Sequence, residues 1–130
     1  MPISLETKQK IFSLLKTAML KHCPPLVNNK NKAEAFEVIG NIPTEYGSKK
    51  TIVSGMYMAS IAFRTDSVVF YFFPCYMNEA AFKPLAPNTW KLLKGKTCFH
   101  FKKENDFNEQ EIEALFKKGM EFYKKQGWLK

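Results

Sequence analysis

The chain has 130 residues, of which 45% are hydrophobic and 25% charged, and its formal net charge is +8. A chain of this length and composition buries its core without disulfide bonds or structural metals. We therefore expect a single domain spanning residues 1–130. The N-terminal region lacks the apolar run of a secretory signal, and no apolar run approaches the ~20 residues that cross a bilayer. We expect a cytoplasmic protein that has no membrane partner.

The positive charge comes almost entirely from lysine, because Arg64 is the only arginine. Sites that read bases or grip a phosphate with two bonds favour the planar fork of arginine. The lysines are scattered along the chain, which favours a solvated surface, although a module that binds nucleic acid or another polyanion stays open as an alternative. The three cysteines, Cys23, Cys75 and Cys98, include no CxxC pair, so we expect free thiols.

The N-terminal region predicts an amphipathic helix that begins after Ser4 and ends near His22, just before two prolines. Its apolar stripe has helical spacing and consists of Ile11, Phe12, Leu15, Ala18 and Met19. Residues 26–32, with NNKNK at their centre, are interpreted as a polar connector. Residues 33–42 fit a strand better than a helix, and residues 43–50 are interpreted as a loop.

The central stretch 51–76 predicts a β-hairpin. Two aromatic-rich runs, Ile52–Phe63 and Val68–Phe73, are joined by the polar link Arg64–Ser67. Side chains alternate across a strand, and here both faces are apolar, unlike those of a half-solvated strand. Either both faces are covered within the fold, or one face is a binding or dimer surface.

Shorter elements are expected after the hairpin, whose second strand ends at Pro74. Residues 78–82 predict one or two helical turns, and Asn88 can cap a second short helix at Thr89–Leu93. Residues 97–103 predict a strand.

The C-terminal helix carries the clearest local signals. Asn108 is a suitable N-cap, Glu111 three residues later indicates a capping box, and Gly127 marks the end. Gly119 lies on the apolar side and would let another backbone approach closely. The order of elements predicts an α+β fold, in which an antiparallel β-sheet packs against N- and C-terminal amphipathic helices.

Four stretches together resemble the YdhG-like family of small bacterial domains of unknown function, which is distantly frataxin-like. The stretches are Gly55–Tyr57, Val69–Pro74, Leu93–Phe101 and Gly119–Tyr123 with Gly127-Trp128. The resemblance covers roughly Ser54–Trp128 and implies a compact α+β fold in the cytosol. One branch of the family is regarded as iron chaperones, so the resemblance implies intracellular iron delivery as a further alternative.

The residues of the first helix argue against iron delivery. Frataxin-like iron binding uses an acidic ridge on the first helix and first strand, because hard iron ions prefer clustered carboxylates. Here Glu6 is the only acid in a first helix that carries several lysines, and only Glu34 and Glu37 fall in the probable first strand.

No sequence motif identifies a reaction or a cofactor site. The chain contains no GxGxxG, no GxxxxGK[ST] and no nucleophile elbow. Cys98 and His100 are the best metal-like pair, since alternate residues of a strand share a face, but a zinc site needs three or four ligands. We expect no catalytic residues and no cofactor.

The leading functional hypothesis is a non-enzymatic binding domain. Its aromatic sheet face would hold a small anionic ligand, a partner protein or a second copy of the chain as a homodimer. The candidate ligand-binding residues combine aromatic rings with a few polar groups, and they are Tyr57, Arg64, Tyr71, Phe73, Tyr76, Trp90, Lys94 and His100.

Overall fold

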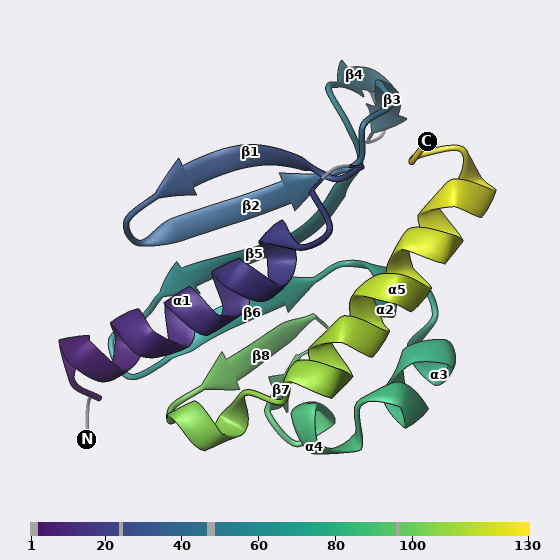
Figure 1. The fold of residues 1–130 in the computed structure, drawn as a ribbon. Helices are drawn as coiled ribbons and strands as arrows, with labels where there is room; N and C mark the ends of the chain where they lie inside the picture. Colours follow the sequence, from purple (N-terminus) through teal and green to yellow (C-terminus); the bar gives the residue numbers. More distant parts are fainter. Residues whose placement is uncertain (1–2, 24, 47–48, 96) are drawn as a thin grey trace.

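The computed structural model describes residues 3–23, 25–46, 49–95 and 97–130, and it has an α+β fold (Figure 1). The helices and turns of 3-10 helix are α1 (Leu5–Leu20), α2 (Pro74–Met77), α3 (Glu79–Phe82), η1 (Lys83–Leu85), α4 (Pro87–Trp90), η2 (Glu104–Asp106) and α5 (Glu109–Gln126). The strands are β1 (Val27–Lys32), β2 (Ala35–Ile39), β3 (Thr44–Tyr46), β4 (Thr51–Val53), β5 (Tyr57–Phe63), β6 (Val68–Phe72), β7 (Leu93–Lys94) and β8 (Cys98–Phe101).

Six strands form one antiparallel sheet in the order β1-β2-β5-β6-β8-β7, and β3 pairs with β4 in a separate two-stranded sheet. The helices α1 and α5 lie side by side on one face of the larger sheet (Figure 1). The predicted fold class is therefore confirmed. Because α1 and α5 lie on the same face, the opposite face of the sheet has no long helix of the described chain packed on it.

The N-terminal helix forms as predicted. The Ser4 hydroxyl accepts a hydrogen bond from the backbone N–H of Thr7 at 3.1 Å, which satisfies one of the free N–H groups of the first turn. The buried residues of α1 are the predicted apolar stripe: Ile11, Phe12, Leu15, Ala18 and Met19. Burial of this stripe against β5 and β6 fixes the helix on the sheet.

The C-terminal helix is capped as predicted, but the predicted capping box is wrong. Asn108 Oδ1 accepts from the N–H of Glu111 at 3.1 Å, and Gly127 ends the helix with a left-handed φ of 80°. The Glu111 carboxylate does not return to Asn108. It accepts hydrogen bonds from Asn88 and Thr89 instead, and so ties α4 to α5.

The covered face of the sheet carries the core. Alternate residues of four neighbouring strands point toward α1 and α5 and are fully buried, as the predicted alternation in Val68–Phe73 requires. They are Phe36, Val38, Ala59, Ile61, Val68, Phe70, Phe72, Phe99 and Phe101. Gly119 of α5 lies over this layer. A Cβ there would come within 3.2 Å of three side chains, those of Met58, Phe72 and Pro74, so side chains and not another backbone make the close approach.

Several predicted boundaries need correction. The expected connector at 26–32 is the edge strand β1, and all its side chains are exposed, so the sequence shows no alternation there. The expected loop at 43–50 contains β3, while its residues 47 and 48 lie outside the described part. The expected strand Ile52–Phe63 is interrupted between β4 and β5. The short helix at Thr89–Leu93 is α4 and begins at Pro87, so Asn88 is inside it and is no cap.

Candidate functional site: the open face of the sheet

The face of the six-stranded sheet opposite α1 and α5, here called the open face, has no described helix packed on it (Figure 1). The strand register aligns one row of side chains across it, from β2 through β5, β6 and β8 to β7. That row consists of Glu37, Ser60, Tyr71, Cys98 and Lys94. Its aromatic, hydroxyl, thiol and charged groups have the mixed character of a ligand surface.

Arg64 directly follows β5, and its side chain extends to Tyr71 on the open face. Its guanidinium donates to the Tyr71 hydroxyl at 2.6 Å, and its Cζ lies 5.9 Å from the centroid of the same ring. Both contacts hold the exposed guanidinium in place beside the face. Remaining N–H groups of the guanidinium can therefore donate to an anion without first being ordered.

The same half of the open face is electropositive. His100 lies two residues beyond Cys98 on β8, at the next position on the same face, and its Nδ1 is 3.4 Å from Ser67 Oγ. Partial burial lowers the pKa of His100, and the nearby cations Lys94, Lys102 and Arg64 lower it further, against the opposing effect of Asp66. A neutral imidazole among three cations favours an anionic guest.

Aromatic rings gather at the other end of the open face, and one predicted residue does not belong to them. Tyr57 and Phe73 lie 6.1 Å apart between ring centroids, and Phe73 stacks on the exposed Tyr76 at 5.9 Å. Trp90 instead packs edge-on against Phe99, whose ring belongs to the covered face. The structure therefore brings seven of the eight predicted ligand residues to the open face or its edge, whereas half-buried Trp90 packs against the core of the covered face.

Tyr57 reaches the open face through a β-bulge. Ile39 pairs with Tyr57 where regular pairing would continue from Val38 and Ala59, so Met58 is the extra residue of β5. The shift turns Tyr57 to the side of Ser60, and their hydroxyl oxygens lie 2.6 Å apart. Strict alternation would put Tyr57 on the face of Ala59 and Ile61 and Met58 on the opposite face. The bulge reverses both, since Met58 is buried on the covered face beside Gly119 of α5.

A cavity of about 370 Å³ opens beside Tyr57. Its lining residues come from β1, β2, β4, the link between β4 and β5, and the start of β5, and they are Asn29, Glu37, Ile39, Val53, Ser54, Gly55 and Tyr57. Asn29 Nδ2 donates to Glu37 Oε2 at 2.6 Å. Burial raises the pKa of Tyr57 to about 12, and the nearby Glu37 carboxylate acts in the same direction. Except for Tyr57, sequence reasoning did not place these residues in a site, because three separate strands contribute them.

Two glycines, Gly40 and Gly55, allow the backbone segments that line this cavity to approach each other closely. A Cβ on Gly55 would lie 1.8 Å from the carbonyl oxygen of Gly40, and the N–H of Gly40 donates to the carbonyl of Met56 at 2.8 Å. The end of β2 and the link between β4 and β5 are therefore in direct backbone contact. A sequence signal was present, since both glycines interrupt apolar runs.

The suggested metal pair shares the open face but gains no further ligand. Cys98 and His100 lie on alternate positions of β8, as predicted. Among the described residues, no group of three or more His, Cys, Asp or Glu side chains is placed to hold a metal ion. His22, the other histidine, lies at the far side of the core, where its Nε2 is 3.2 Å from Glu113 Oε2 and its ring stacks on Phe116.

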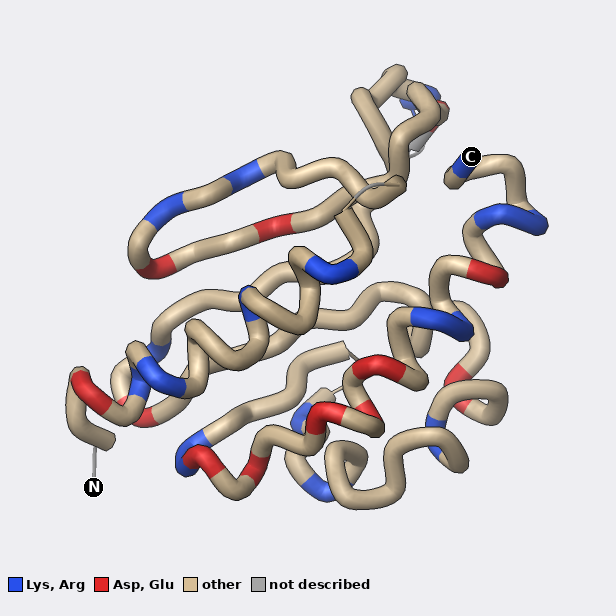
Figure 2. The backbone as a smooth tube through the Cα atoms, in the orientation of Figure 1, with Lys and Arg blue, Asp and Glu red and all other residues tan. Residues whose placement is uncertain are grey.

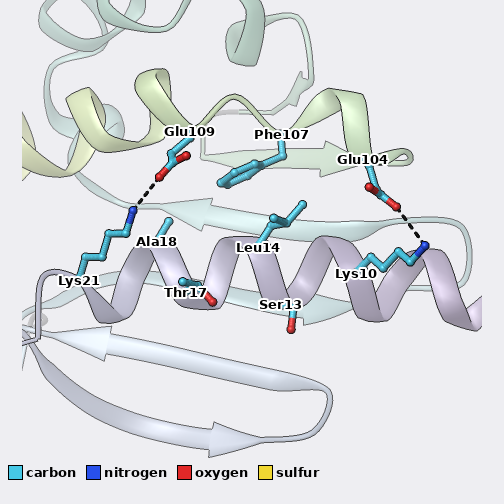
Figure 3. Close-up of a pocket in the computed structure, with 9 residues that line it drawn as sticks. All are labelled: Lys10, Ser13, Leu14, Thr17, Ala18, Lys21, Glu104, Phe107 and Glu109. Carbon is cyan, nitrogen blue, oxygen red and sulfur yellow. Dashed lines mark hydrogen bonds and ion pairs between the residues drawn. The ribbon is translucent and has the colours of Figure 1, made fainter.

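A second cavity, of about 330 Å³, lies between α1 and the segment that leads into α5 (Figure 3). Leu14 and Phe107 form its apolar centre. Ion pairs close both ends, one between Lys21 and Glu109 at 2.6 Å and one between Lys10 and Glu104 at 3.5 Å. Each end thus carries balanced charge, and this groove shows no preference for an anion or a cation.

No protein-family model, curated protein or solved structure matches the chain. The YdhG-like and frataxin-like resemblance therefore stays a prediction from the sequence. Among the described helices, none is long and apolar enough to cross a membrane. Positive charge is spread over most elements of the fold, and α1, β1 and α5 each carry lysines (Figure 2).

Proposed function

We propose that this protein is a non-enzymatic binding domain whose open face holds a small organic anion. The observation that carries the proposal is the arrangement of Arg64 over Tyr71, beside His100 and Lys94. The anionic group would take charge-assisted hydrogen bonds from the guanidinium and the lysine. A planar part of the ligand would pack on the aromatic side chains, as ligand sites combine apolar walls with a few oriented polar groups.

The distribution of charge supports a small anion over a long polyanion. A polyanion would be bound by a continuous stripe of cations, but the basic residues of this chain are spread over many separate elements (Figure 2). The anchoring arginine is also single, whereas several cations usually follow a nucleic-acid backbone.

The test uses adenosine 5′-monophosphate as a probe, because it joins a planar ring to a compact anion. We expect backbone amide resonances of Tyr71 and His100 to shift in NMR titrations of the full chain, and adenosine, which lacks the phosphate, to bind at least fivefold more weakly. Arg64→Gln and Lys94→Gln should each weaken binding of the probe. Lys117→Gln on α5 removes the same charge far from the open face and should leave binding unchanged.

Three results would overturn the proposal. Equal affinities for the probe and adenosine would show that the protein does not recognise the anionic group. Resonance shifts confined to the covered face would show that the ligand does not bind on the open face. Binding of an oligothymidine with a steep loss on added salt, and no binding of the probe, would favour the nucleic-acid alternative. A stable dimer mass in native mass spectrometry, with the open face protected from hydrogen exchange, would show that a second copy occupies it.

A further inference from the structure

The cavity beside Tyr57 differs in charge from the electropositive half of the open face. Glu37 is the only charged group among the described residues that line it, in a chain whose net charge is +8. The contact recorded for its carboxylate is with the neutral amide of Asn29, at 2.6 Å. Lys30 is the cross-strand neighbour of Glu37, but within the described chain it forms no ion pair with Glu37 at 4.0 Å or less.

We propose that this cavity binds a small organic ammonium ion, that is, a protonated primary amine on an apolar or aromatic stem. The inference does not rest on the proposed anion site, because the cations that would hold the anion, Arg64 and Lys94, do not line this cavity. It rests on charge complementarity between Glu37 and an ammonium group, and on the shape and apolar walls of the cavity.

The lining groups match the two parts of such a ligand. Glu37 Oε2 already accepts from Asn29, so Oε1 remains to accept a charge-assisted hydrogen bond from the ammonium group. The ring of Tyr57 lies in the same lining and can attract the cation through its π face. Ile39 and Val53 supply the apolar walls for the stem. The volume of about 370 Å³ falls within the range of ~300–1,000 Å³ typical of small-molecule pockets.

The cavity is also built before any ligand arrives. The bulge at Met58 turns Tyr57 toward it, and the contact of Gly40 with Gly55 holds the link between β4 and β5 against the end of β2. β-bulges are enriched next to functional sites because they redirect a side chain. A pocket that keeps its shape in the free protein loses less entropy on binding.

The experiment compares 2-phenylethylamine with 2-phenylethanol, which has the same ring and stem but no charge at neutral pH. Each is titrated into the full chain at low salt and followed by backbone amide NMR. We expect the amine to shift the resonances of Glu37, Ser54, Gly55 and Tyr57, and to bind at least fivefold more tightly than the alcohol. Glu37→Gln, which keeps the size of the side chain, should abolish that preference.

A matched control is available on β3. Glu45→Gln makes the same charge change on the exposed side chain of a residue that does not line the cavity, and it should retain the preference for the amine. If Glu37→Gln fails to fold, Tyr57→Leu keeps an apolar side chain and should weaken the amine more than the alcohol. Equal affinities of the two probes, an unchanged preference in a folded Glu37→Gln variant, or shifts outside the cavity would each overturn the inference.

Discussion

Glu111 should contribute more to stability than any other carboxylate of α5. Its side chain accepts from the backbone N–H and the hydroxyl of Thr89, both at 2.7 Å, and from the side-chain amide and backbone N–H of Asn88, at 2.9 and 3.3 Å. Glu111 is 8% exposed and Thr89 is fully buried. In Glu111→Ala all four donors would lose their acceptor, and the two on buried Thr89 would have no access to water to replace it, whereas Asn88 is exposed.

The expected magnitude follows from these contacts. A hydrogen bond to a charged group contributes about 1.5–3 kcal/mol, but four bonds to one carboxylate are not additive. Each of the two buried Thr89 donors left without an acceptor costs about 1–3 kcal/mol, and the gain in helix propensity from alanine is only a few tenths. We expect Glu111→Ala to lower the free energy of unfolding by about 3–4 kcal/mol, a large share of the ~5–15 kcal/mol typical of a domain.

Urea denaturation monitored by tryptophan fluorescence measures this change, and Trp90 reports directly on α4. The matched control is Glu121→Ala on the same helix, where the carboxylate is exposed and makes a loose pair with Lys125 at 3.9 Å. It should lie within about 0.5 kcal/mol of the wild type. A loss below 1 kcal/mol in Glu111→Ala would refute the reasoning, because it would mean that water or a rearranged α4 satisfies the donors at little cost.

Two further predictions concern pH and backbone packing. Burial alone would raise the pKa of Glu111, but the hydrogen bonds from Thr89 and Asn88 outweigh it and hold the pKa below its usual value. The stabilisation by ionised Glu111 is therefore complete above the unfolded-state pKa of ~4.3 and is lost as the pH falls through the lower folded-state pKa. Between pH 6 and pH 3 the free energy of unfolding should therefore fall less in Glu111→Gln than in the wild type. Gly55→Ala would place a Cβ 1.8 Å from a backbone oxygen, so we expect the free energy of unfolding in urea to fall by more than about 2 kcal/mol. In the control Gly95→Ala the new Cβ meets no atom within 4 Å, so the only cost should be the ~1–2 kcal/mol of placing alanine at a left-handed φ. Equal losses in the two variants would contradict the close backbone contact.

The elements with strong periodicity could be predicted from the sequence. The α1 stripe and the Ser4 and Asn108 caps follow from local rules that hold whatever the rest of the chain does. The hairpin of β5 and β6 followed from two apolar runs and a polar link, and its Arg64 N–H donates to the Ser67 carbonyl at 2.8 Å. These signals were sufficient to predict the fold class and which residues of β6 share a face, but not which of the two faces meets the core.

The remaining errors have physical causes that a single sequence does not reveal. The edge strand β1 forms because its backbone pairs with β2, and its exposed side chains carry no pattern of burial. The extra residue Met58 changes the face of Tyr57, and a bulge is determined by pairing with a strand distant in sequence. The position of Glu111 fits the local rule for a capping box, but its carboxylate instead accepts hydrogen bonds from the N–H and hydroxyl of Thr89 on α4, a contact distant in sequence.

The open face exists because the two long helices have enough area to cover only one of the two faces of the sheet. Six strands spaced about 4.8 Å apart make a sheet roughly 24 Å wide, and two helices about 10 Å in diameter cover one such face. The short helices supply no second layer, since Phe82 and Trp90 pack on Phe72 and Phe99 of the covered face. The helices therefore cover the apolar side chains of β5 and β6 on one face of the sheet only. Rings and charges on the other side are held by the sheet itself, so substitutions such as Arg64→Gln and Glu37→Gln should alter binding with little effect on folding.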